Sequence, residues 1–137
     1  MRAMTSISIR GIASATLVFA VACGSDPVAP PGVQPQITND TDAFSYQITS
    51  LDNVTGTYDY SWQNTGTLAK VTHASNAGGT GTATVTLRDA AGTQVYSGAF
   101  ASSGEPVSSA GVAGAWNITV AYTNYSNAQV NFGVVKQ

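Results

Sequence analysis

Hydrophobic and polar positions divide the chain into three stretches. Residues 11–22 are uncharged and mostly apolar, residues 24–36 contain four prolines, and from Ile37 onward apolar and polar residues alternate in short runs. Alternation with period two is typical of strands with one buried face, because successive side chains point to opposite faces. The pattern therefore predicts a leader, an extended connection and an all-β domain.

The alternating runs are separated by turn-forming Gly, Asn and Ser residues, and no helical period follows the leader. Asp89-Ala90-Ala91-Gly92 predicts a hairpin turn in which Gly92 takes a positive φ. With a weak run near Val107 included, the alternating runs amount to about eight short strands. We therefore expect a single antiparallel β-sandwich, jelly-roll or immunoglobulin-like, over residues 38–137. Its apolar positions are Phe44, Tyr46, Ile48, Tyr58, Tyr60, Trp62, Ala69, Val71, Ala83, Val85, Leu87, Val95, Trp116, Ile118, Val120, Tyr122, Val130, Phe132 and Val134.

The first 22 residues have the features of an export signal. Arg2 and Arg10 precede the apolar run of residues 11–22, and the first 22 residues contain no acidic residue. The run ends in small residues, as signal peptides do before their cleavage site. The run is shorter than the roughly 20 apolar residues of a spanning helix. We therefore expect residues 1–22 to be removed as a signal peptide.

Val21-Ala22-Cys23 resembles the lipobox of bacterial lipoproteins, in which the cysteine becomes lipidated. The resemblance implies a diacylglycerol and an N-acyl chain such as palmitate on Cys23, and Gly24 after it implies delivery to the outer membrane. Ala20 stands where leucine is usual, and Ala20-Val21-Ala22 also fits ordinary signal peptidase. Ordinary cleavage would release a soluble protein that begins at Cys23.

Cys23 is the only cysteine, and an unpaired thiol in an oxidising compartment is reactive, which favours lipidation. Residues 23–37 would then be the lipidated cysteine and a tether. Proline-rich segments favour polyproline II at about 3.1 Å per residue, so the tether could hold the domain roughly 40 Å from the lipid.

A second resemblance covers residues 80–137. A strand, the Asp89–Gly92 turn, a second strand and then Gly114-Ala115-Trp116-Asn117-Ile118-Thr119-Val120 are similar to bacterial pre-peptidase C-terminal-type jelly-roll modules. The resemblance implies an appended, non-catalytic domain of an exported protein, and it bears on the fold more than on any ligand.

Charge excludes several classes of partner. Only 9% of the residues are charged, and all seven acidic residues follow Cys23, whereas two of the five basic residues precede it. The chain after the leader therefore carries three basic and seven acidic residues, a net charge of −4. This balance offers neither the basic patch that binds nucleic acid nor a polybasic membrane contact.

Candidate chemistry is sparse. His73 is the only histidine and has no recognisable nucleophile motif near it, so we expect a surface or edge-strand histidine and no enzyme. Zinc needs three or four ligands of the Cys, His or carboxylate type, which one histidine does not supply. The best candidate cation ligands, with Ca²⁺ in mind, are Asp40 and Asp42 in Asn39-Asp40-Thr41-Asp42, and then Asp89, although such residues also form turns.

Aromatic residues allow two interpretations. Tyr58, Tyr60 and Trp62 lie on one face of a strand and either fill the core, which we favour, or form a platform that stacks on sugars. Tyr96 and Tyr125 lie off the main apolar faces and are the candidates for exposed ligand contacts. The sequence thus predicts an anchored, monomeric, non-catalytic binding or structural module of the cell envelope, with a carbohydrate-binding module as the alternative.

Overall fold

The computed structural model describes residues 34–75, 79–100 and 104–137. They form six strands: β1 (Gln36–Asp40), β2 (Ala43–Asn64), β3 (Ala69–His73), β4 (Thr80–Arg88), β5 (Gln94–Ala99) and β6 (Gly114–Lys136). Within these residues there is no helix, and hence none that could cross a membrane. The leader, Cys23 and the tether as far as residue 33 lie outside the described residues.

All strand pairs are antiparallel, and the sheet order is β1-β2-β6-β4-β5, with β3 paired to β6. Two strands dominate: β2 has 22 residues and β6 has 23, and they pair along almost their whole lengths. The first part of β2 and the last part of β6 lie between β1 and β3, whereas the first part of β6 lies between the far part of β2 and β4. Both long strands therefore belong to two layers.

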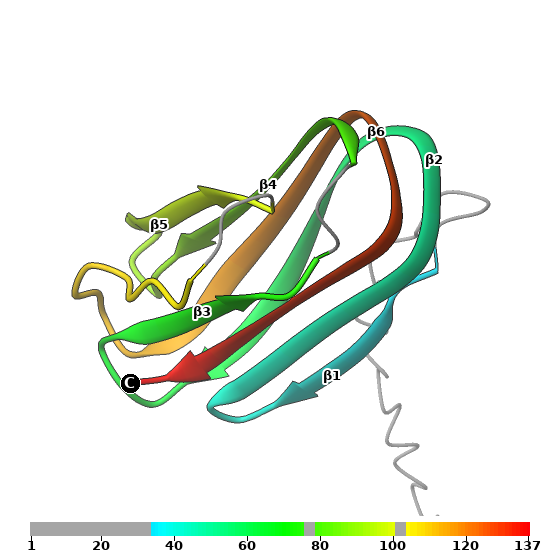
Figure 1. Cartoon of the computed structure of the whole chain (residues 1–137). Helices are drawn as coiled ribbons and strands as arrows, with labels where there is room; N and C mark the ends of the chain where they lie inside the picture. The colour runs from blue at the N-terminus through cyan, green and yellow to red at the C-terminus, as the bar shows by residue number, and fades with distance from the viewer. Residues whose placement is uncertain (1–33, 76–78, 101–103) are drawn as a thin grey trace, which may run out of the picture.

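The long strands pass from one layer to the other through a shared bend (Figure 1). The pairing register shifts between Leu51 and Gly56, and Ser50, Asn53 and Asn124 have positive φ. Bulges of this kind bend a strand and increase its twist. At the same bend Gly81 has a φ of +78°, and a Cβ there would overlap the backbone of Asn124, so the position requires glycine.

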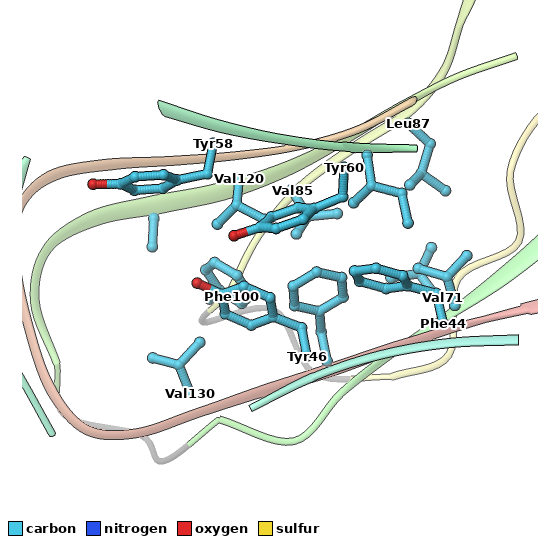
Figure 2. Packing of buried hydrophobic residues seen from close by; sticks show 14 of the residues in the cluster. Phe44, Tyr46, Tyr58, Tyr60, Val71, Val85, Leu87, Phe100, Val120 and Val130 are labelled. Atoms are coloured by element: carbon cyan, nitrogen blue, oxygen red, sulfur yellow. The ribbon is translucent and has the colours of Figure 1, made fainter. Parts of the chain in front are cut away.

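The core lies between the two layers. Figure 2 shows Tyr58 and Tyr60 pointing from one layer toward Tyr46 and Phe44 of the other. The ring of Tyr60 lies 5.8 Å from the rings of both Phe44 and Tyr46. Trp62 is 1% exposed and packs edge-on against Trp116. The prediction that Tyr58, Tyr60 and Trp62 fill the core is therefore confirmed.

Residues 104–112 close the side of the sheet bounded by β3 and β5. The amide of Val71 donates to Pro106 O at 2.9 Å, and Ser108 N donates to Ala69 O at 2.8 Å. In the other direction Ser109 N donates to Val95 O of β5 at 2.9 Å. The segment thus fastens two strand edges that do not pair with each other. The weak run predicted near Val107 belongs to it and forms a single β-bridge with Lys70.

The all-β, antiparallel architecture is confirmed, and its detail differs from the expectation. The sheet curls into a half-barrel rather than forming two clearly separate sheets (Figure 1). Four of the predicted strands are joined in pairs, one pair forming β2 and the other β6. Their pairing with each other continues on both sides of the bends at residues 50–56 and 123–127. The first strand begins at Gln36, so Asn39 and Asp40 lie in β1 and only Thr41 and Asp42 form the turn.

Candidate functional site

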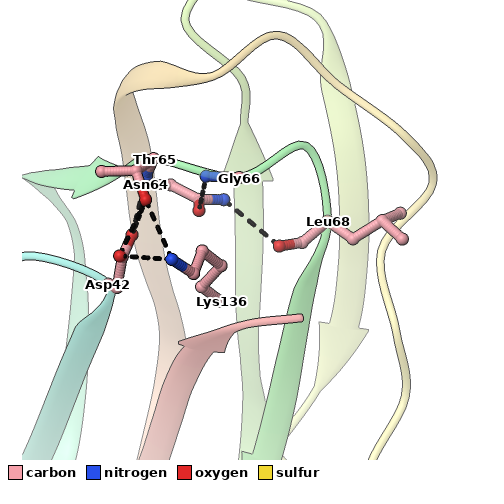
Figure 3. Close-up of polar contacts among 6 residues, drawn as sticks. All are labelled: Asp42, Asn64, Thr65, Gly66, Leu68 and Lys136. Atoms are coloured by element: carbon pink, nitrogen blue, oxygen red, sulfur yellow. Dashed lines mark hydrogen bonds and ion pairs between the residues drawn. The ribbon is translucent and has the colours of Figure 1, made fainter.

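The densest polar cluster lies where the β1–β2 turn, the β2–β3 loop and the end of β6 meet (Figure 3). Asp42 has a positive φ of 67°, and its Oδ1 accepts a hydrogen bond from Thr65 N at 2.7 Å. Its Oδ2 forms an ion pair with Lys136 Nζ at 2.7 Å. The hydrogen bond from Lys136, followed by that from the Thr65 amide, lowers the pKa of Asp42 to about 2. Asp42 therefore ties three chain segments together.

Buried Asn64 supports the same corner. It is fully buried, its Oδ1 accepts from Gly66 N at 2.9 Å, and its Nδ2 donates to Leu68 O at 3.3 Å. An amide side chain that bonds the backbone of the following residues stabilises a turn as an Asx motif. The corner is thus organised by short polar side chains bonded to backbone groups.

Asp89 has a comparable structural role in the β4–β5 turn. Its Oδ1 accepts from Ala91 N and Thr93 N at 3.0 and 2.8 Å, and its Oδ2 accepts from Val112 N at 2.9 Å. These backbone donors, Val112 first, lower the pKa of Asp89. The predicted hairpin turn is confirmed, with Gly92 at a φ of +82°. The same carboxylate also attaches residue 112 to this turn.

The candidate cation ligands are therefore not assembled into one site. Asp42 is engaged by Lys136 and Thr65, Asp89 by three backbone amides, and Asp40 is exposed on β1. In the part of the chain that the structure describes, no group of three or more His, Cys, Asp or Glu side chains could hold a metal ion. The cation site stays a prediction, with a structural role for two of its three residues.

His73 lies on β3 and is half-buried. Its Nε2 lies 2.8 Å from Tyr96 Oη of β5, and its ring packs edge-on against Phe100. Burial lowers the pKa of His73 and raises that of Tyr96. The imidazole is thus hydrogen-bonded to a phenol, and the pair joins the two strand edges that residues 104–112 also fasten.

The expectation that Tyr96 and Tyr125 are exposed fails for Tyr125. Tyr125 is 6% exposed, stacks on Tyr122 at 5.6 Å, and accepts a hydrogen bond from Asn127 Nδ2 at 2.9 Å. Between Tyr122 and Tyr125, β6 advances three residues while β2 advances two, so the bulge turns Tyr125 inward. Tyr96 is half-buried, with its hydroxyl on His73.

The outward face of β2, β6, β4 and β5 carries polar side chains, with the Asp59 carboxylate among the hydroxyl groups of serine and threonine. Asp59, Thr119, Thr86 and Ser97 lie opposite one another in these four neighbouring strands. Thr119 donates to Asp59, and the hydroxyls of Thr86 and Ser97 lie 3.3 Å apart. Such a surface can exchange hydrogen bonds with a neutral polar partner.

Sequence reasoning missed the contact that joins β1 to the far part of β2. Asn39 Nδ2 donates to Ser61 O at 2.8 Å, and Asp42 N donates to Gln63 O at 2.8 Å. These partners are 22 and 21 residues apart along the chain. No local pattern could have indicated them.

Comparison with protein-family models, with curated proteins and with solved structures finds no match in any of the three.

Proposed function

We propose that this chain is an exported bacterial lipoprotein whose β domain is a non-catalytic binding or structural module of the cell envelope. The observation that carries the proposal is the lone cysteine, Cys23, which directly follows Ala20-Val21-Ala22 at the end of the apolar run. The first strand begins at Gln36, directly after the last of the four prolines, so the folded domain includes residues 36 and 37 at the end of the predicted tether.

The polar groups of the domain support a non-catalytic role. The surroundings lower the pKa of three polar residues, Asp42, Asp89 and His73. Each of them connects one segment of the fold to another through a hydrogen bond. Perturbed pKa values also arise in structural networks of this kind. The proposed working surface is therefore a sheet face or edge that offers neutral hydrogen-bonding groups.

Incorporation of labelled palmitate tests the anchor. We expect label in the wild-type protein and in Gly24→Ala, a matched change at the next residue, and none in Cys23→Ala. The labelled protein should partition into detergent and Cys23→Ala into the aqueous phase, because several acyl chains anchor stably. An unlabelled wild-type protein whose first residue is an unmodified Cys23 would replace the proposal with ordinary cleavage and release.

Membrane sorting gives a separate test. We propose outer-membrane delivery on the basis of Gly24, so Gly24→Asp should move the lipidated protein toward the inner-membrane fractions of a density gradient. Equal distribution of the two proteins would contradict the sorting step and leave lipidation itself intact.

A carbohydrate-binding role has lost its main support. The aromatic stripe on which it depended, Tyr58, Tyr60 and Trp62, is buried between the layers (Figure 2). Sugar platforms need ring faces open to the ligand, and the remaining candidate, Tyr96, is half-buried with its hydroxyl bonded to His73.

A further inference from the structure

Four strand edges of the described residues have no strand paired to them, those of β1, β3, β5 and the far part of β2, and they differ in how they are covered. Within the described residues, the edges of β3 and β5 are both bonded to residues 104–112. Among the strands that the structure describes, none pairs with the outer edge of β1, since β1 pairs only with β2, and the far part of β2 reaches β1 through the hydrogen bond from the Asn39 side chain to Ser61 O. An unpaired edge is a template for another strand.

The register identifies which groups of β1 face outward. Lys136 N donates to Asp42 O, so the even-numbered residues at the start of β2 direct their backbone groups toward β6. The odd-numbered residues then face β1, and their partners there are Gln36, Thr38 and Asp40. The backbone groups of Ile37 and Asn39 therefore point away from the sheet.

β1 lacks the features that usually protect an edge strand. Its residues Gln36, Ile37, Thr38, Asn39 and Asp40 are all exposed and include no lysine, no proline and no bulge. Its single charge is Asp40, at the end next to the turn. Such an edge suits an extended strand with few charges, and a second β1 is a strand of that chemistry.

We propose that two copies of this chain pair through their β1 edges, antiparallel, about a two-fold axis at Thr38. Ile37 then lies opposite Asn39 of the other copy on both sides of the axis, which gives about four backbone hydrogen bonds. Thr38 lies opposite Thr38, and Gln36 opposite Asp40, so no like charges meet. A shift of two residues would place Asn39 opposite Pro35, which has no N–H, or Ile37 opposite Thr41 of the turn.

The proposed pairing differs from the sequence-based expectation of a monomer. The edge has only five residues, so association in dilute solution should be weak. If the chain is also lipid-anchored, confinement to a membrane raises the effective concentration of the two edges. The edge geometry itself does not depend on the anchor.

Cysteine cross-linking tests the pairing independently of lipidation. In the full-length chain with Cys23→Ser, which leaves no native cysteine, Thr38→Cys should form a disulfide-linked dimer under mild oxidation. The two Thr38 Cα atoms would lie about 4.5 Å apart, within the range that a disulfide spans. Gln36→Cys is the matched control on the same face, because its two copies would be about 14 Å apart and should not cross-link.

Two further measurements complete the test. A mixture of Gln36→Cys and Asp40→Cys chains should form a cross-linked heterodimer, since these residues are opposite in the proposed register. Ile37→Pro removes an outward N–H and no bond to β2, so it should reduce the Thr38→Cys cross-link about tenfold or more with the β circular dichroism retained. Equal cross-linking of Thr38→Cys and Gln36→Cys, or a monomer with no cross-link at high concentration, would overturn the proposal.

Discussion

The side of the half-barrel that residues 104–112 close and the side that β1 bounds are fastened to different extents. On the closed side, backbone bonds to β3 and β5 are joined by the Asp89 carboxylate, the His73–Tyr96 pair and the buried ring of Phe100. On the β1 side, the described hydrogen bonds between the layers include Asn39 with Ser61, Asp42 with Gln63 and the Asp42 carboxylate with Thr65, all near the turn.

The difference shows how a domain with few charges closes a curled sheet. Only two ion pairs occur among the described residues, Lys70–Glu105 and Lys136–Asp42. The closed side instead relies on short polar side chains that accept backbone N–H groups, and on aromatic burial. The β1 side has neither in quantity, so substitutions on the two sides should differ in their effect on unfolding.

The largest effect should come from Phe100, under the closed side. Phe100 is 2% exposed, stacks on Tyr122 at 6.0 Å and packs against Phe132 at 5.4 Å. Phe100→Ala should reduce the free energy of unfolding by about 3–5 kcal/mol, because it leaves a cavity in a packed core. Ile37→Ala on the β1 side should cost about 1 kcal/mol or less in the same urea titration. Equal losses would mean that the closed side is not the better fastened one.

A smaller but localised effect should follow loss of the Asp89 carboxylate. Asp89→Ala leaves the amides of Ala91, Thr93 and Val112 without their acceptor, so hydrogen exchange at these three amides should accelerate. Asp59→Ala, on the outward face, is the control and should leave those amides protected. Unchanged protection in Asp89→Ala would show that residues 110–112 are held by other contacts.

A pH effect smaller still should come from His73. Its folded pKa is lowered by burial, so the unfolded chain binds the proton more readily. Stability should therefore be fully present above the ordinary pKa of 6.5 and should decline as the pH falls below it. His73→Phe, which keeps a ring against Phe100, should abolish this decline in urea midpoints measured between pH 7 and pH 5. Tyr96→Phe should retain it, since burial and not the phenol lowers the pKa; a decline that survives in His73→Phe would assign it to another group.

Period-two alternation was sufficient to predict the all-β class, the buried faces and the β4–β5 turn. Residues such as Tyr58, Tyr60 and Trp62 alternate without interruption, and the structure buries them as predicted. The bulges were not predictable in this way, because one additional residue in β6 reverses the face of Tyr125 and no local pattern marks the insertion. For the same reason the alternation predicts four separate strands where the structure has the two continuous strands β2 and β6.

The candidate sites were less accessible to sequence reasoning than the fold. The sequence identifies Asp42 and Asp89 as candidate ligands, but their partners are set by the topology. Lys136 is 94 residues from Asp42 along the chain, and Val112 is 23 residues from Asp89. The exposed edge of β1 is likewise a property of the sheet order, because whether a strand is central or outermost depends on what pairs beside it.

The smallest effect should come from the ion pair that holds the β1 side to the end of β6. The Lys136 hydrogen bond lowers the pKa of Asp42 from 3.8 to about 2, so this contribution is present above pH 3.8 and disappears as the pH falls toward 2. Asp42→Asn should reduce the thermal midpoint slightly at pH 6 and hardly at pH 2, and Lys136→Met should behave alike because it removes the same pair. Asp40→Asn changes the charge at a neighbouring exposed position and should leave the midpoint unchanged at both pH values. If Asp42→Asn and Asp40→Asn were indistinguishable at pH 6, the Lys136–Asp42 ion pair would contribute nothing measurable, and the β1 side would be held by its other hydrogen bonds, such as that from Asn39 to Ser61 O.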